Sequence, residues 1–407
     1  MSGTSAWRDV YLAVGARAIS TCGDFLAATA LVLAMQERGA GGGAVAGVLI
    51  AAALPPVLLA RWTGRLADRV DSRLLLIGAG LAQAAVCVAL ASVGNVAVIV
   101  ALVAVLGCGL AVTAPVAAAL LPAMVTRADL PRASALAQTA TSIGLLLAPV
   151  LGGVLTGQFG LRVPLLVDAA SFLALAAAGL LIRTRRGRPA TAGAADRPAF
   201  RLRADMLLWS MFVLVGVVLT AVSAVNVAEV FLVRDVLGSS ATVYGLLGAT
   251  WTGAMLAGAW LLTRRGFDDA GLVTVLLVMF AVTSLGVFAT GLVPAVGWIF
   301  PLFVLGGMAN GAENVAAGLL IARRVPDAVH GQAYAAYGAV TGAAVVIGYL
   351  VAGLVVGPLP VRWVIAGAGL LGLLATAVLA GPMLRGRRVS RRPVGSSAGA
   401  TSGPPPA

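Results

Sequence analysis

Residues 74–126 read LLLIGAGLAQAAVCVALASVGNVAVIVALVAVLGCGLAVTAPVAAALLPAMVT, 53 residues without a charged side chain. This stretch is long enough for two membrane-spanning helices of about 20 residues each, joined by a turn. Gly94-Asn95 is the natural position for that turn. Because a backbone exposed to lipid must satisfy its hydrogen bonds internally, the stretch predicts two consecutive transmembrane helices.

The remainder of the chain has the same character. Hydrophobic residues make up 60% of the sequence, charged residues only 11%, and the mean hydropathy is +1.01. A soluble protein of 407 residues would need a more polar surface. We expect an all-α integral membrane protein with twelve transmembrane helices, at about 10–35, 44–62, 73–93, 96–120, 134–157, 162–183, 206–233, 243–263, 270–292, 294–320, 333–357 and 362–384.

The basic residues are distributed unequally between the two sides of the predicted membrane. The chain has no lysine, so its 28 basic residues are all arginine. With the N-terminus inside, 23 of them fall in cytoplasmic segments, four lie outside and Arg17 lies within the first span. This asymmetry predicts a multi-pass protein of the cell membrane with both termini in the cytoplasm, and it explains the net charge of +13 without nucleic acid. We expect no cleaved signal peptide, because the first span contains Arg17 and Asp24.

A comparison of the sequence with itself indicates a duplication. At an offset of 200 residues, Asp68 aligns with Asp268 and Gly153 with Gly353, and the order of spans is preserved. We therefore predict two six-helix bundles at residues 1–183 and 205–384, as in transporters with parallel repeats. A cytoplasmic linker at 184–204 and a disordered basic cytoplasmic tail at 385–407 complete the organisation.

The charged segment before residue 74 reads Gly64-Arg-Leu-Ala-Asp68-Arg69-Val-Asp71-Ser72-Arg73. It resembles the short cytoplasmic loop between the second and third helices of major facilitator superfamily (MFS) transporters. Asp71 and Ser72 depart from that pattern, which usually has Gly and a basic residue there. The resemblance implies a cytoplasmic gate at Gly64, Asp68, Arg69 and Arg73, although such charges also serve simply to anchor topology.

The fifth span contains Gly144-Leu-Leu-Leu-Ala148-Pro149-Val-Leu-Gly152-Gly153. It resembles the Gly-Pro-x-x-Gly-Gly helix of MFS exporters, with Ala148 in place of a Gly. The resemblance implies that this helix lies between two moving bundles, with Pro149, Gly152 and Gly153 at the interface. Simple helix packing is the alternative.

Two further segments resemble the enterobactin and macrolide exporter branch of that superfamily. They are Ser20-Thr21-Cys22-Gly23-Asp24 in the first span and Phe231-Leu-Val-Arg-Asp-Val-Leu-Gly238 after the seventh. The resemblance implies export of a drug, an antibiotic or a siderophore.

Ionisable residues within the spans are the main candidates for mechanism, because each costs about 2.5–3.5 kcal/mol at the bilayer centre. Asp24 is the first choice for proton coupling, followed by Glu313 and Glu229. A buried structural pair is the alternative for each, as it is for Asp168. The fourth span lacks the Arg of better-known drug exporters, so Arg17 is the candidate cavity cation. The predicted coupling and substrate residues are Arg17, Asp24, Glu229, Asn310, Glu313 and Asn314.

These features predict a monomeric secondary transporter that exports a small amphipathic molecule by alternating access in exchange for protons. The chain has no phosphate-binding Gly-x-x-x-x-Gly-Lys motif, and its only histidine, His330, lies in a predicted loop, so we expect no enzyme, cofactor or metal. The three cysteines lie within spans and are expected to pack as small apolar residues. A proton-coupled uptake symporter and a non-transporting sensor on the same scaffold are the alternatives.

Overall fold

The computed structural model describes residues 5–184, 202, 205–326 and 329–389. The side chains of residues 61, 64, 67–69 and 387–389 lie outside this description. Most of the predicted linker and tail falls outside it as well, but helix α12 continues to Val389, beyond the expected start of the tail at residue 385.

The described residues form twelve α-helices, as predicted. They are α1 (Trp7–Glu37), α2 (Gly41–Arg69), α3 (Ser72–Ser92), α4 (Val96–Met124), α5 (Leu130–Phe159), α6 (Arg162–Leu181), α7 (Met206–Phe231), α8 (Ala241–Thr263), α9 (Asp269–Leu292), α10 (Ile299–Arg324), α11 (His330–Val355) and α12 (Val361–Val389). A short π-helical segment, η2 (Leu232–Val236), extends α7, and the 3₁₀ turn η3 (Val296–Trp298) precedes α10.

Eleven of these helices are long and apolar enough to cross a membrane. The exception is α10, which carries the three neighbouring polar residues Asn310, Glu313 and Asn314. The predicted turn at Gly94-Asn95 is confirmed, since α3 ends at Ser92 and the Asn95 side chain caps α4 by accepting from the N–H groups of Ala97 and Val98.

The expected loop at 64–73 is much shorter than predicted. Helix α2 continues to Arg69, and α3 begins at Ser72. The Asp71 carboxylate accepts a hydrogen bond of 2.8 Å from the backbone N–H of Arg73 and so caps α3. The departure of Asp71 from the family pattern therefore has a structural reason.

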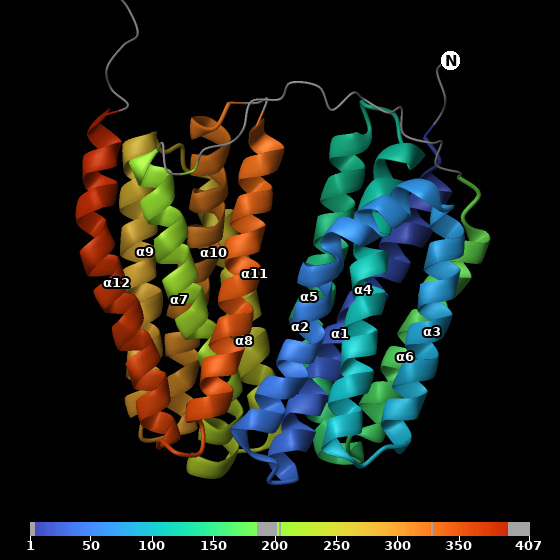
Figure 1. The fold of residues 1–407 in the computed structure, drawn as a ribbon, viewed down its shortest axis with the longest axis horizontal. Coiled ribbons are helices and arrows are strands. Elements are labelled where there is room, and N and C mark those ends of the chain that lie inside the picture. Colours follow the sequence, from blue (N-terminus) through green and yellow to red (C-terminus); the bar gives the residue numbers. More distant parts are fainter. Residues whose placement is uncertain (1–4, 185–201, 203–204, 327–328, 390–407) are drawn as a thin grey trace, which may run out of the picture.

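The helices pack mainly within two sets. In the first, α1 contacts α5 and α6, α2 contacts α4, and α3 contacts α6 and α4; in the second, α7 contacts α11 and α12, α8 contacts α10, and α9 contacts α10 and α12. Contact between the sets is concentrated at α5 with α8 and at α2 with α11 (Figure 1). The ribbons diverge toward the side where α1 begins and α12 ends, which we call the terminal side (Figure 1).

The apolar core has the same asymmetry. At the far side, a single cluster joins residues of both sets, among them Leu31, Val45, Val230 and Ile365. At the terminal side there are two separate clusters, one around Val10 with residues of the first set only, the other with residues of the second set only. The two sets therefore share a core at the far side and have independent cores at the terminal side.

Glycines allow the sets to meet. A Cβ atom on Gly245 of α8 would clash with the carbonyl oxygen of Pro149 and lie 3.1 Å from the Cα of Gly153, both on α5. At the other contact, a Cβ on Gly353 of α11 would lie 2.7 Å from the Cβ of Ala46 on α2. Gly153 and Gly353 are 200 residues apart, so the sequence repeat places a glycine at both contacts.

The outer surface suits a bilayer. Large apolar side chains such as Leu180, Leu354 and Val378 are exposed on the helices. Exposed tryptophans stand near helix ends: Trp298 and Trp363 on the far side, and Trp260, stacked 3.7 Å from the guanidinium of Arg264, on the terminal side. Tryptophan at both ends is typical of the two membrane interfaces.

Replacement of Gly245 by leucine is expected to destabilise the protein by about 1–3 kcal/mol, because the new side chain cannot fit against Pro149 without moving α5. The measurement is thermal unfolding of the purified protein in detergent. Gly367→Leu is the control, since nothing lies within 4 Å of its Cβ position. Equal unfolding temperatures for the two variants would contradict the role of Gly245.

Candidate functional site

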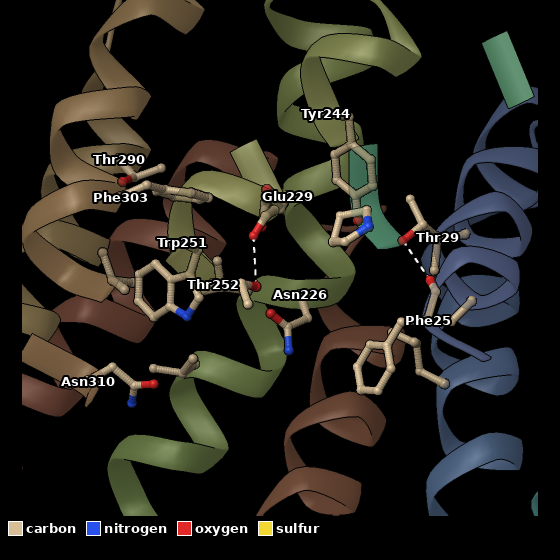
Figure 2. A pocket seen from close by; sticks show the side chains of 18 of the residues that line it. Phe25, Thr29, Asn226, Glu229, Tyr244, Trp251, Thr252, Thr290, Phe303 and Asn310 are labelled. Atoms are coloured by element: carbon tan, nitrogen blue, oxygen red, sulfur yellow. Dashed lines mark hydrogen bonds between the residues drawn. The ribbon is translucent and has the colours of Figure 1, made fainter. Parts of the chain in front are cut away.

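A cavity of about 350 Å³ lies between the two helix sets. The first set contributes Phe25 and Thr29 from α1 and Pro149 from α5, and the second set contributes most of the remaining wall. Figure 2 shows the cavity with side chains converging from α1, α7, α8, α9 and α10. Its principal polar and aromatic residues are Phe25, Asn226, Glu229, Tyr244, Trp251, Thr252, Phe303, Asn310 and Tyr349.

Glu229 brings a carboxylate into this cavity. It lies on α7 three residues after Asn226, so both side chains project from one face of the helix. The Thr252 hydroxyl beside them donates to the carbonyl of Gly248, 3.0 Å away. Among the described residues, no hydrogen bond or ion pair engages the Glu229 carboxylate.

Glu313 lies behind the cavity. It is 3% exposed and accepts a 2.6 Å hydrogen bond from the Thr283 hydroxyl and a 3.3 Å bond from the Asn310 amide. A smaller cavity of about 50 Å³ borders Glu313, Asn310 and Asn314, and Asn310 also lines the large cavity. The Asn314 amide donates to the Asn310 carbonyl within α10. Thus the predicted polar cluster of α10 connects Glu313 to the large cavity through Asn310.

Asp24 occupies a different place. It lines a cavity of about 80 Å³ inside the first set, together with Asp168 of α6. Asp168 is 1% exposed and accepts hydrogen bonds from the Cys87 thiol and the Ser171 hydroxyl. Gly23 permits this arrangement, because a Cβ there would clash with the Asp168 carboxylate. The four predicted acids therefore form two groups, one in each set.

Arg17 belongs to neither cavity wall. Its Nη1 atom is buried and has no hydrogen-bond partner. A buried guanidinium nitrogen without a partner among the described residues is costly and uncommon in folded proteins.

The structure describes one of the four predicted gate side chains. The Arg73 guanidinium donates to the carbonyls of Gly179 and Leu180 at the end of α6, at 3.1 and 3.0 Å. It thereby ties α3 to α6 within the first set. The side chains of Gly64, Asp68 and Arg69 lie outside the described residues.

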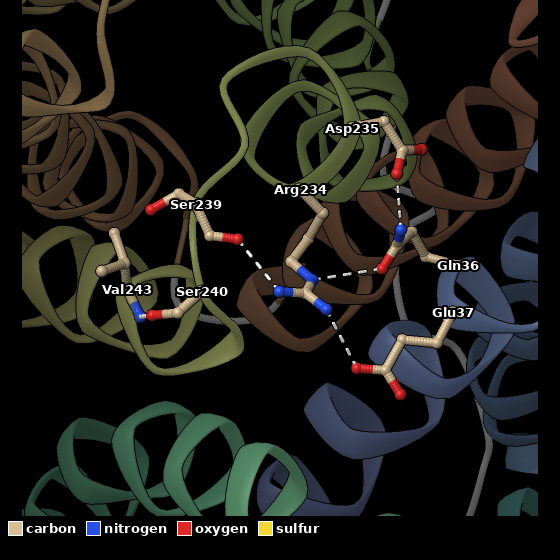
Figure 3. Close-up of polar contacts among 7 residues, drawn as sticks. All are labelled: Gln36, Glu37, Arg234, Asp235, Ser239, Ser240 and Val243. Atoms are coloured by element: carbon tan, nitrogen blue, oxygen red, sulfur yellow. Dashed lines mark hydrogen bonds and ion pairs between the residues drawn. The ribbon is translucent and has the colours of Figure 1, made fainter.

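On the far side, a polar lock joins the two sets. The Arg234 guanidinium bonds to the Glu37 carboxylate at 3.1 Å and to the Gln36 side-chain oxygen at 3.3 Å (Figure 3). The Gln36 amide donates to Asp235 at 2.6 Å, and Arg234 also donates to the carbonyl of Ser239 (Figure 3). We call the four side chains of Gln36, Glu37, Arg234 and Asp235 the far-side lock.

The segment Phe231–Gly238 contributes two residues to the far-side lock. Arg234 and Asp235 lie on the π-helical segment η2, only five residues after Glu229. Single π-helical turns interrupt α-helices mostly at functional positions. The sequence singled out this segment, but it did not reveal the partners Gln36 and Glu37.

The fifth-span motif lies on α5, which contacts both α1 and α8. Pro149 and Gly153 of α5 contact α8, whereas Gly152 faces α1, where a Cβ would lie 2.9 Å from the Leu26 carbonyl oxygen. Pro149 also lines the large cavity. The motif thus contacts another helix of its own set, the opposite set and the cavity.

Some cavity residues gave little signal in the sequence. Asn226, Tyr244 and Tyr349 lie singly in apolar helices, where periodicity does not show which way they face. Trp251 and Phe303 pack edge to face at 5.4 Å in the cavity wall. Five aromatic residues in all line it.

Thr283→Val is expected to destabilise the protein by about 1–3 kcal/mol, because the variant removes the 2.6 Å donor to the buried Glu313 carboxyl. Thr283→Ser retains the hydroxyl and serves as the control. Thermal unfolding in detergent would compare them, and a valine variant as stable as the serine variant would show that this bond contributes nothing.

The family model of the Major Facilitator Superfamily matches residues 13–300. No curated protein matches the sequence. Among solved structures, the fold is similar to the peptide transporter POT (TM-score 0.76, 13% identity, covering 94% of this chain and 95% of that one). It is also similar to the nucleoside transporter NupG (TM-score 0.73, 14% identity, covering 92% of this chain and 99% of that one). A third similar structure is a bacterial homologue of the iron transporter ferroportin in an inward-facing state (TM-score 0.72, 16% identity, covering 96% of this chain and 100% of that one).

The family match covers more than half of the chain, and the solved structures that share its fold are membrane transporters. A multi-pass protein with a cavity between two helix sets agrees with both findings. The chain belongs to the Major Facilitator Superfamily.

Proposed function

We propose that the protein is a proton-coupled exporter of a small amphipathic compound. The observation that supports this most directly is the cavity of about 350 Å³ whose wall is built by both helix sets, with the far-side lock beyond one end of it. A site shared by two bodies changes its access when the bodies rock against each other. Alternating access is therefore the mechanism that this geometry favours.

In this proposal, the two sets are rigid six-helix bundles, residues 1–183 and 205–384, joined by the linker. The bundles touch through the glycine contacts of α5 with α8 and of α2 with α11. Polar bonds hold the terminal side together within each bundle: Asp9 accepts from the N–H groups of Arg183 and Thr184, and Asp205 pairs with Arg324 at 2.9 Å. Such bonds permit each bundle to move as a unit.

In this proposal the protein is a monomer of the cell membrane, and its terminal side faces the cytoplasm, which the arginine distribution favours. The structure then corresponds to an inward-open state, with the far-side lock closed toward the outside. Gly64, Asp68, Arg69 and Arg73 would form the opposing latch when the cytoplasmic side closes.

Export rather than uptake is supported by the resemblance of the fifth-span motif to that of MFS exporters, and two of its residues, Pro149 and Gly153, lie at the contact between the sets. The segments 20–24 and 231–238, which resemble the enterobactin and macrolide exporter branch, contribute Asp24 and the lock residue Arg234. The similar solved structures are named as transporters of peptides, nucleosides and iron, so the fold does not indicate the substrate. The residues that line the cavity are the remaining guide to it.

Asp24 is our candidate for the proton carrier. It lies in a cavity of its own beside a second acid, Asp168, and apart from the wall that would hold the substrate. Arg17, with a buried and unpartnered Nη1 atom, supplies the cation that would pair with a deprotonated acid. Proton exchange and substrate binding would thus occur in different places.

In proteoliposomes loaded with antibiotics and siderophores, an imposed pH gradient is expected to drive transport by the wild type. Asp24→Asn should abolish this dependence while gradient-independent counterflow persists, because an amide exchanges no proton. Asp269→Asn is the matched control, because its carboxylate lies at the start of α9, outside the cavities, and is 40% exposed. If transport by the Asp24 variant still depends on the pH gradient, Glu313 becomes the candidate proton carrier. If transport by the wild type does not depend on the gradient, antiport is refuted.

The direction in which protons move relative to the substrate distinguishes export from uptake.

Opening of the far-side lock should expose the cavity. Arg234→Glu is expected to accelerate labelling of a Thr29→Cys side chain by an impermeant thiol reagent applied from the far side. We expect about a twofold to fivefold change, since a partly exposed ion pair contributes about 0.5–1 kcal/mol. The native cysteines would first be replaced by alanine.

The swapped pair Arg234→Glu with Glu37→Arg restores the attraction and should return labelling toward its original rate. If the swapped pair labels as fast as the single variant, the ion pair does not hold the far side closed.

A further inference from the structure

The described lining of the large cavity carries charge of one sign only. Among the described residues that line it, Glu229 is the only one with a charged side chain, and none is basic. Arg17, the cation expected from the sequence, does not line it. Any ligand in this cavity therefore encounters a single carboxyl group with no positive neighbour in the wall.

The Glu229 carboxyl also lacks a partner of its own. Glu313 has two donors, from Thr283 and Asn310, and Asp168 has donors from Cys87 and Ser171. Glu229 has neither a hydrogen bond nor an ion pair among the described residues. A half-buried carboxylate that faces a largely apolar cavity without a protein partner favours a proton or a cationic group of the ligand.

The surrounding wall is suited to a large organic cation. Tyr244, Trp251 and Tyr349 lie in it with Glu229, and aromatic faces attract alkylammonium and similar cations. Asn226 and Asn310 offer amide groups that orient a polar substituent (Figure 2). At about 350 Å³, the cavity lies within the range of about 300–1,000 Å³ found for small-molecule sites.

We propose that the transported substrate is an organic monocation, whose positive charge pairs with the Glu229 carboxylate while its apolar body packs on the aromatic wall. This inference rests on the proposed function, and it narrows the amphipathic substrate to a cationic one. Glu229 is thereby a binding residue that selects for charge, and Asn226 and Asn310 orient the rest of the molecule.

The test compares two probes of similar size and shape but opposite charge, tetraphenylphosphonium and tetraphenylborate. Equilibrium binding of each to the purified full-length protein in detergent would be measured. Tetraphenylphosphonium should bind at least about tenfold more tightly, and Glu229→Gln should reduce its affinity by about 10- to 100-fold, as expected for loss of a charge-assisted contact.

Glu229→Asp retains the charge and should recover most of that affinity, which separates loss of charge from a folding defect. Asp269→Asn removes a partly exposed carboxylate at the start of α9, far from the cavity, and should bind as the wild type does. Equal affinities for the two probes, or unchanged binding by Glu229→Gln, would overturn the proposal.

The two hypotheses fail in different ways. Cation-selective binding without gradient-driven transport would leave the charge assignment standing and refute the exporter. Gradient-driven transport with no preference for the cation would support the exporter and refute the charge assignment.

Discussion

Close approach of helix backbones is the interaction on which the rest of this structure depends. Lipid gives apolar helices no hydrophobic reason to associate, so contact between them relies on close packing and on polar bonds. The two helix sets meet where Gly245 rests on Pro149 and Gly153, and where Gly353 rests on Ala46. These contacts bring α5 against α8 and α2 against α11, and they leave a cavity between the sets. A side chain at Gly245 would separate the walls that hold the ligand.

The packing between the two helix sets differs between the two sides of the molecule. One apolar cluster spans both sets at the far side, and the far-side lock lies beyond it. At the terminal side, the two clusters are separate, and polar groups such as Asp9 and Asp205 bond within their own set. An alternating transporter needs such contacts to be breakable. The partly exposed ion pair of the far-side lock contributes only about 0.5–1 kcal/mol, which suits it to be exchanged for contacts on the other side.

The four intramembrane acids are distributed evenly between the two helix sets. Asp24 and Asp168 lie within the first set, whereas Glu229 and Glu313 belong to the second and lie in or beside the cavity. Glu313 is satisfied by Thr283 and Asn310, whereas Glu229 has no hydrogen-bond partner in the part of the chain that the structure describes. Glu229 therefore differs from Glu313 and Asp168 in its hydrogen bonding, and from Asp24 in lining the cavity between the sets. The π-helical segment places the lock residue Arg234 a few residues beyond Glu229, so ligand and lock share one helix.

The class of protein, the twelve helices and most of their ends could be predicted from the sequence alone. A lipid bilayer permits long apolar helices and few other structures, and caps such as Asn95 act locally. The sequence did not reveal that α2 continues through Arg69, since charged residues also end helices at a membrane surface. Only the tertiary structure decided which ionisable residues meet. In a helix that is apolar on every side, periodicity does not say which face looks inward, so the separation of Asp24 from Glu229 and the pairing of Arg234 with Glu37 depend on how helices distant in sequence pack together.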